Sequence, residues 1–268
     1  MACAWPWPAG AQLQLAPDQG PQRVFGCEAQ RISVVWHNAG GQSADAQLGL
    51  RLYQASSATA VLLRGMSWKR LEVLPGQTVL ESARLDFPAV RAETRFLVQW
   101  VDATDRVLGT TEVRAYPTNL LGELGPLLGE GKLGVLDPAD ALKGLLRQNG
   151  LECLDLGETE LEDFRGRLAI LGPFPSQAQM REGLAPGIQR VAAKGAAVVW
   201  LQPAPGAKEE IKPSFYLVPE GKGAVVIVQA ELVAGLRENP RAQLNLLHCC
   251  KLALNPAPFS LPNLTPEP

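Results

Sequence analysis

Cysteine and histidine, the side chains most often used for nucleophilic attack and metal binding, are scarce in this chain. The cysteines are Cys3, Cys27, Cys153, Cys249 and Cys250, and the histidines are His37 and His248. No CxxC pair and no Cys/His spacing of the zinc type occurs, so we expect no metal site and no cofactor. Cys3 and Cys27 can pair as a disulfide if the chain is exported, and free thiols that only pack are the alternative.

A thiol and a base are sequence neighbours at His248–Cys249–Cys250. This stretch is predicted to be helical, and adjacent helical side chains point about 100° apart and do not face each other. Cys250 also continues an apolar stripe of leucines, which predicts a core position. Packing is therefore the expected role of both thiols. Cys153, inside the stretch LECLDL, is expected to fill a buried strand.

Carboxylates gather in the stretch GETELEDF (157–164). Glycoside hydrolysis needs two carboxyl groups that face each other about 5–10 Å apart, whereas like charges crowded on one loop are typical of a solvated surface. The stretches GEGKLG (129–134) and EGKGA (220–224) precede strands and lack the spacing of a phosphate-binding loop, so they are expected to be turns.

Tryptophan is the remaining candidate for ligand contact. Trp5 and Trp7 lie in AWPWP, where the prolines stiffen the chain, and exposed indole faces can stack on sugar rings. These two residues are the candidate glycan-stacking site, and packing against the edge of a sandwich is the alternative. The other tryptophans are predicted to be core or inter-domain residues: Trp36, Trp68, Trp100 and Trp200.

The composition is that of a globular protein long enough for two domains. The chain has 268 residues, of which 46% are hydrophobic and 19% charged, and its net charge is −2. It has no dense basic run, so no nucleic-acid partner is expected. No apolar stretch approaches the ~20 residues of a membrane span; the stretch AVVIV at 224–228 has the length of a strand.

Residues 1–116 are predicted to form an all-β sandwich. Between residues 11 and 116, apolar and polar residues alternate in short stretches separated by turn signals such as NAGG and PG, with no helical pattern between them. The expected strands are 31–38, 46–54, 67–74, 77–87, 94–102 and 106–116.

After Pro117 the pattern changes to strands alternating with helices. Residues 117–131 are expected to be a linker or an outer turn, and residues 132–268 an α/β domain whose parallel sheet is covered on both faces. The expected strands are 132–137, 151–156, 167–174, 196–201, 214–219 and 223–229, and the expected helices are 138–150, 178–195 (interrupted at Pro186) and 239–254.

Three stretches of the second half resemble a class I glutamine amidotransferase-like domain of the kind appended to modular β-galactosidase-type glycoside hydrolases. They are LGVLDPADALKGLLRQNGLECLDL, LAILGPFP and EGKGAVVIVQAELVAGLRENPRAQLNLLHCCKLAL. The first half resembles the Ig-like sandwiches beside such domains, through VVWHNAGGQSADAQLGLRLY and VLPGQTVLESARLDFP. The resemblance implies an Ig-like sandwich followed by a flavodoxin-like sheet, a carbohydrate-processing setting and a secreted or periplasmic location.

Active amidotransferases of this type carry their cysteine on the turn after the fourth strand. Here that strand, AAVVWL, runs into Gln202 and Pro203. Glutamine is not a nucleophile in this setting, and Pro203 and Pro205 remove N–H groups that an oxyanion hole would use. The His-x-Glu partner is absent as well. The resemblance therefore implies that the nucleophile site has been lost and that no catalytic residue remains.

We expect non-catalytic accessory or assembly modules of a carbohydrate-active protein. The expected partner is a catalytic domain of the same or a neighbouring polypeptide, a second copy, or a glycan. A hydrolase acting at the carboxyl ends of the parallel strands is the alternative, because open α/β sheets bind ligands there. Its candidate lining residues are Asp137, Pro138, Gly172, Pro173, Gln202 and Gln229. A glycan-binding module that uses Trp5 and Trp7 is the third reading.

Overall fold

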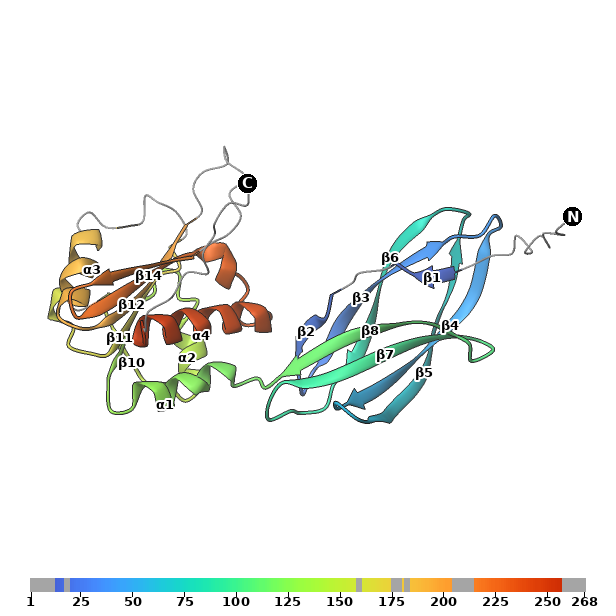
Figure 1. Ribbon diagram of the computed structural model, residues 1–268, viewed down its shortest axis with the longest axis horizontal. Coiled ribbons are helices and arrows are strands. Elements are labelled where there is room, and N and C mark those ends of the chain that lie inside the picture. The colour runs from blue at the N-terminus through green and yellow to red at the C-terminus, as the bar shows by residue number, and fades with distance from the viewer. Residues whose placement is uncertain are drawn as a thin grey trace, which may run out of the picture. The chain divides into compact units, whose positions relative to one another are not determined.

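The computed structural model describes residues 13–16, 20–157, 161–174, 180, 184–203 and 215–256. Contacts within the chain divide it into two compact units, Met1–Thr118 and Asn119–Pro268. The fold is rich in sheet, with two sheets in the first unit and a six-stranded sheet in the second (Figure 1). None of the helices in the described ranges combines the length and the apolar character that crossing a bilayer requires.

Two sheets build the first unit. Its strands are β1 (Leu13–Leu15), β2 (Gln22–Phe25), β3 (Ala29–Asn38), β4 (Ala44–Ala55), β5 (Ala60–Val73), β6 (Thr78–Asp86), β7 (Thr94–Asp102) and β8 (Val107–Tyr116). One sheet has the order β1-β3-β6 and the other the order β2-β8-β7-β4-β5. Neighbouring strands are antiparallel except β2 and β8, which are parallel.

Side chains from both sheets form one hydrophobic core in the first unit. Trp36 of β3 and Trp100 of β7 are fully buried, and their rings meet edge to face with centroids 5.7 Å apart. Trp68 of β5 adds a third ring 5.0 Å from Trp100. The buried indole N–H of Trp100 donates to the Thr111 hydroxyl at 2.9 Å, which satisfies a polar group that burial would otherwise penalise. The prediction of core positions for Trp36 and Trp100 is confirmed.

Strand β5 begins at Ala60, seven residues before the predicted start. Residues 60–65 are all exposed, so they show no alternation between a buried and a solvated face. They are strand because they pair with β4, from Arg51 opposite Gly65 to Ala55 opposite Ala60. Pairing without burial leaves no trace in a hydrophobic pattern.

The second unit is built on one six-stranded sheet of order β10-β9-β11-β12-β14-β13. All neighbours are parallel except β13 and β14, which are antiparallel. The strands are β9 (Leu133–Leu136), β10 (Cys153–Asp155), β11 (Leu168–Leu171), β12 (Ala197–Gln202), β13 (Phe215–Glu220) and β14 (Gly223–Gln229). The helices are η1 (Leu120–Glu123), α1 (Leu124–Leu128), α2 (Lys143–Gln148), η2 (Leu161–Asp163), α3 (Leu184–Ala193), η4 (Ala230–Val233) and α4 (Pro240–Leu254), of which the η segments are 3-10 helices.

Both faces of this sheet are covered. Val199 and Leu201 of β12 lie in one core cluster with residues of α4, whereas Val198 between them lies in a second cluster with residues of α3. Every residue of β9 and β11 is buried. Burial on both faces explains why these strands have continuous apolar sequences.

The structure differs from the expected linker at 117–131. Residues 120–128 form η1 and α1, and four of their leucines are buried: Leu120, Leu121, Leu124 and Leu128. Three of these, all but Leu120, belong to the same core cluster as α4. These leucines therefore belong to the second unit. The prediction of a linker rested on the glycines and prolines of the stretch, which are also common in connecting segments.

Helix α3 is not interrupted at Pro186, contrary to the prediction, and residues 178–179 and 181–183 of the predicted helix lie outside the described residues. Helix α3 spans Leu184–Ala193 in the described residues, with Pro186 in its first turn. Proline is tolerated there because the first N–H groups of a helix have no partner within the helix.

Candidate functional site

The carboxyl ends of four parallel strands lie along one edge of the six-stranded sheet. Asp137 directly follows β9, Gly172 directly follows β11, and Gln202 and Gln229 end β12 and β14. Leu171 lies in register with Leu136 and Trp200, and Gln202 with Gln229. The structure thus brings the four predicted strand-end residues to a common edge, which we call the strand crest.

The Asp137 carboxylate is hydrogen-bonded to backbone N–H groups. Its carboxylate, in a residue only 5% exposed, accepts hydrogen bonds from the N–H groups of Ala141, Leu142 and Lys143 at 3.1, 2.7 and 2.9 Å. The Lys143 N–H is the first of α2, and the other two N–H groups lie just before the helix, so the carboxylate holds the chain that enters α2 and interacts favourably with the helix dipole. Its role is that of a cap at the start of α2, because both of its oxygens accept hydrogen bonds from the backbone there.

The same capping explains why α2 is shorter than the predicted 138–150. Asp140 has a left-handed φ of 50°, and the N–H groups of residues 141–143 turn back to Asp137. The chain becomes helical only at Lys143. The predicted start at residue 138 is five residues too early, because hydrophobic periodicity carries no information about the hydrogen bonds between Asp137 and residues 141–143.

Gly172 is required by local packing. Its φ is 101°, its N–H donates to the Leu136 carbonyl at 2.7 Å, and a Cβ atom would stand 2.6 Å from the Leu201 carbonyl oxygen. Only glycine combines this backbone conformation with so close an approach of a neighbouring strand. The peptide bond to Pro173 is cis.

The tip of β12 carries no reactive group among the described residues. Gln202 is half-buried and Pro203 follows it, whereas residues 204–214 lie outside the described residues. A primary amide donates and accepts hydrogen bonds but is neither an acid nor a base near neutral pH. Gln202 and Gln229 can therefore orient a ligand but cannot attack one.

A hollow of about 570 Å³ lies beside the strand crest. Of the predicted residues only Pro173 lines it; the rest of its wall comes largely from η4 and the following loop. Its charged lining residues are Asp140, Glu231, Arg237 and Glu238. Sequence reasoning missed Glu231, which lies just after the strand ending at Gln229, and also Arg237 and Glu238, which follow it after a stretch of uncharged residues. No cysteine, serine or histidine is among the described lining residues.

An ion pair between β10 and α2 was also missed. The Lys143 ammonium lies 2.6 Å from the Asp155 carboxylate, and the Gly157 N–H donates to the same group at 2.8 Å. The hydrogen bond between the two side chains holds the pKa of Asp155 below its usual value and raises that of Lys143. Both groups therefore stay charged and paired, which suits a structural contact.

The cysteines near the C-terminus do not form a reactive site. Cys249 and Cys250 are 2% and 0% exposed, and burial raises the pKa of Cys249 to about 11 and raises that of Cys250 as well. A thiol held in the neutral form is a poor nucleophile. Both are buried, although they point in different directions, because α4 contacts β12 and β14 and also η1 and α1. The expected packing role is confirmed.

The remaining candidates divide between the described and the undescribed residues. Trp5, Trp7 and Cys3 lie outside the described residues, while Cys27 is exposed. In the acidic stretch, Glu162 pairs with Arg190 of α3 at the surface. Within the described ranges, no group of three or more His, Cys, Asp or Glu side chains is arranged to hold a metal ion.

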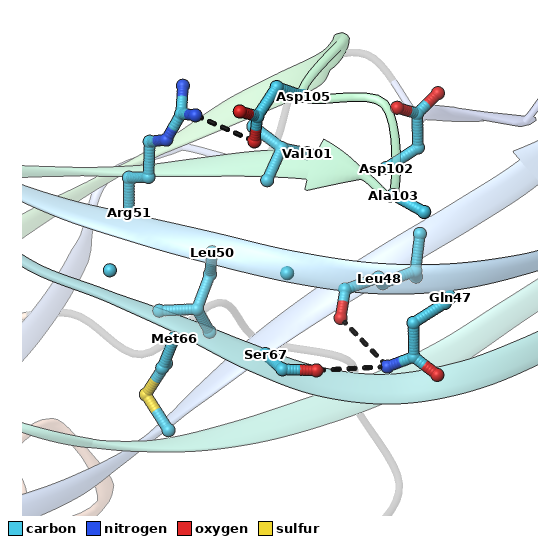
Figure 2. Close-up of a pocket in the computed structure, with 12 residues that line it drawn as sticks. Gln47, Leu48, Leu50, Arg51, Met66, Ser67, Val101, Asp102, Ala103 and Asp105 are labelled. Carbon is cyan, nitrogen blue, oxygen red and sulfur yellow. Dashed lines mark hydrogen bonds and ion pairs between the residues drawn. The ribbon is translucent and has the colours of Figure 1, made fainter.

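A second hollow, of about 400 Å³, lies on the five-stranded sheet of the first unit. We call it the sheet-face hollow; it is lined by β4, β5, β7 and the turn after β7. Figure 2 shows Arg51 meeting Asp105 at one end and Gln47 meeting Ser67 at the other. The Arg51 guanidinium lies 2.7 Å from the Asp105 carboxylate, and the Gln47 amide N–H donates to the Ser67 hydroxyl at 3.1 Å. Sequence reasoning assigned none of these residues to a site.

No protein-family model and no curated protein matches the chain. Among solved structures it is similar to an alkylpurine DNA glycosylase from Pseudomonas fluorescens bound to DNA, with 11% identity, a TM-score of 0.30, and coverage of 40% of this chain and 31% of that one. It is also similar to a β-glucosidase from Listeria innocua in complex with glucose, with 11% identity, a TM-score of 0.27, and coverage of 40% and 16%.

A GH3 β-glucosidase from Bifidobacterium adolescentis is similar at 9% identity and a TM-score of 0.28, with 39% of this chain and 17% of that chain covered. The chain therefore spans less than a third of the length of each of these three proteins. At these scores the likenesses assign neither a family nor an activity to this chain.

Proposed function

We propose that this chain is a pair of non-catalytic modules that serve as an accessory or assembly part of a carbohydrate-active protein. In this proposal the first unit is an Ig-like sandwich and the second an amidotransferase-like α/β domain with a flavodoxin-like sheet. The stretches quoted above, which resemble such modules, supply the carbohydrate-related setting. A secreted or periplasmic location belongs to the same proposal.

The chemistry of the strand crest is the observation that carries the non-catalytic part. The Asp137 carboxylate accepts hydrogen bonds from the backbone at the start of α2, and Gly172 is needed for close packing against Leu201. The tip of β12 carries the amide of Gln202, followed by Pro203. Nucleophilic catalysis needs a nucleophile, a base and an oxyanion donor within hydrogen-bonding reach. The four strand-end residues supply no nucleophile and no available base.

The complete coding frame and its neighbours test the accessory role. We expect the frame to continue into a catalytic domain, or to lie beside genes for carbohydrate-active proteins. Removing this chain from such a protein should lower its soluble yield or its activity on polymeric substrate. A stand-alone frame without such neighbours contradicts the proposal.

A hydrolase is the second candidate, favoured by the hollow beside the strand crest with Glu231 and Glu238 in its wall. The test is hydrolysis of chromogenic glycosides by the purified chain, with Glu231→Gln and Glu238→Gln compared with Glu220→Gln, a change in β13 outside that hollow. Turnover that only the first two variants abolish would establish an enzyme and overturn the non-catalytic reading.

A glycan-binding role for Trp5 and Trp7 stays a separate prediction. Titrating oligosaccharides against tryptophan fluorescence, with Trp5→Ala and Trp7→Ala as variants, tests it. Loss of the signal in these variants would support it, and an unchanged signal would contradict it.

A further inference from the structure

The sheet-face hollow exists because two neighbouring strands carry glycine on the same face. Along β4, Leu48, Leu50 and Leu52 are buried in the core, so Gly49 belongs to the opposite face, as alternation in a strand requires. Gly49 pairs with Ser67 of β5, and Gly65 pairs with Arg51. Two missing side chains on adjacent strands leave the backbone as the floor of the hollow.

The two glycines differ in what the fold requires of them. A Cβ atom on Gly49 would lie 3.2 Å from the Met66 carbonyl oxygen and 3.3 Å from a Val101 methyl, so packing favours glycine there. A Cβ atom on Gly65 would meet nothing closer than Arg51 Cγ at 3.9 Å, and the φ of Gly65 is not in the left-handed region. Neither packing nor backbone conformation explains Gly65.

An unexplained glycine inside a strand is informative because it is costly. Glycine lowers the stability of a strand relative to residues with a side chain, and it often marks a place where a ligand or another backbone approaches closely. Gly65 is exposed and lines the hollow. The open floor at Gly65 is therefore a feature that a ligand could use and that folding does not need.

Each carboxylate that lines the hollow is paired with a guanidinium group, that of Asp105 with Arg51 of the lining and that of Asp102 with Arg106 outside it. The Arg51 guanidinium is paired with Asp105, and the Asp102 carboxylate accepts hydrogen bonds from Arg106 and Thr104. An anionic ligand would need an excess of positive charge, and a cation an excess of negative charge. Because both carboxylates are already paired with guanidinium groups, no unpaired charge faces the hollow from these residues, which favours a neutral ligand.

The polar groups at the two ends are arranged as donor–acceptor pairs. Arg51 offers guanidinium N–H donors beside the Asp105 carboxylate, and Ser67 offers a hydroxyl beside the Gln47 amide. In each pair the donor and the acceptor are separated by about the length of one hydrogen bond. Such a pair can bind two neighbouring hydroxyl groups of a ligand, because each hydroxyl group can both donate and accept a hydrogen bond. The volume lies at the small end of the range for ligand sites.

We infer that the sheet-face hollow binds one ring of a neutral sugar, with vicinal hydroxyls on the Arg51–Asp105 and Gln47–Ser67 pairs and one face of the ring over Gly49 and Gly65. The choice of a sugar among neutral hydroxylated ligands rests on the carbohydrate-related function proposed above. The inference goes beyond that function by assigning a binding site to the first unit.

Nuclear magnetic resonance titration of the isotopically labelled chain tests the inference. The probes are glucose, galactose, xylose and their β-linked disaccharides, with inorganic phosphate and glycerol as comparison compounds. We expect at least one sugar to shift the backbone amide signals of Gln47, Gly49, Gly65 and Ser67. Gly65→Leu, which fills the floor, should weaken this binding by about tenfold or more, equivalent to a binding free energy of about 1.4 kcal/mol.

Gly20→Leu is the matched control, because Gly20 also has open space around its Cβ position and no left-handed φ but does not line the hollow. It should leave binding unchanged. Gln47→Leu is a second variant that removes polar contacts without filling the floor, and it should weaken binding as well. The amide spectrum of each variant reports whether the first unit remains folded.

Several outcomes overturn the inference. These are sugar-induced shifts that occur only outside the hollow, binding that Gly65→Leu and Gln47→Leu leave unchanged, equal binding of glycerol, binding of phosphate in place of sugar, or no binding of any probe. None of them decides the accessory role, which depends on the coding frame and on removal of the chain from its parent protein.

Discussion

The strand crest of the second unit and the sheet-face hollow of the first unit use polar groups and glycines in opposite ways. At the crest, the Asp137 carboxylate is occupied by three backbone N–H groups, and Gly172 is needed where β11 ends against Leu201. In the hollow, polar side chains pair with one another at the surface, and neither packing nor backbone conformation requires glycine at position 65.

This difference separates structural roles from candidate functional ones. A polar group whose hydrogen bonds are all made within the fold contributes to stability, so its removal should first lower the free energy of unfolding. A residue that lowers stability without a packing reason is a better candidate for function, because functional sites are where stability is most often sacrificed. The predictions below test this contrast through the stability of each unit.

The largest effect is expected for Gly172→Ala. The new methyl group would stand 2.6 Å from the Leu201 carbonyl oxygen at a φ of 101°, and we expect a loss of about 3 kcal/mol in the free energy of unfolding of the second unit. Urea unfolding followed through amide signals of β11 and β12 measures it. Gly150→Ala, also at a left-handed φ but with open space around it, is the control and should cost about 1 kcal/mol.

Asp137→Ala should come next. It leaves three backbone N–H groups without their acceptor, two of them half-buried and one buried, and we expect a loss of about 2–3 kcal/mol in the second unit. Asp137→Asn keeps one acceptor oxygen and should cost about 1 kcal/mol. If Asp137→Ala left stability unchanged and instead removed a binding or hydrolytic activity, the crest would be functional and the contrast would fail.

Gly49→Ala should lower the stability of the first unit by about 1 kcal/mol. The Met66 carbonyl oxygen and the Val101 methyl would have to move by a few tenths of an ångström to admit the new methyl group, and a small overpacking of this kind has a cost of that order. Thermal unfolding of the first unit measures the loss. A stabilised variant would show that the floor at Gly49 is not constrained.

Gly65→Ala should have the smallest effect and the opposite sign. The methyl group meets open space in a strand, so the first unit should gain about 0.5–1 kcal/mol through the lower conformational entropy of its unfolded chain. The same thermal unfolding experiment measures the gain, with Gly20→Ala as the comparison outside any strand. A loss of stability at Gly65 would mean that packing does require this glycine, and the contrast between the two glycines would disappear.

Several elements could be predicted from the sequence because their residues have regular patterns of burial. The strand predicted at 94–102 is β7, Thr94–Asp102, whose buried residues include Phe96, Val98 and Trp100. The closing helix predicted at 239–254 is α4, capped by Asn239 through its hydrogen bond from the Arg241 N–H at 3.0 Å. An amphipathic period and a capping residue are local signals.

The candidate site could be predicted in position but not in composition. The order of strands and helices brought Asp137, Gly172, Gln202 and Gln229 to one edge, yet the hollow beside them is lined by residues of η4 and the following loop. Glu231 of η4 and Arg237 and Glu238 of the following loop reach it through the path of the chain after β14, which no periodicity encodes. The role of Asp137 depended on the fold of residues 141–143 around its carboxylate.

The sequence by itself determined the core-facing residues of regular elements such as β7 and α4, and it determined that the tip of β12 lacks a nucleophile. Hydrophobic alternation and side-chain chemistry are properties of the residues in order. Only the tertiary structure decided that 60–65 is strand, that Asp137 is a cap, and that Gly49 and Gly65 lie together between two polar pairs. Strand pairing and register bring together residues that are distant in the chain. The hollow over Gly49 and Gly65 therefore forms only because β4 and β5 pair side by side.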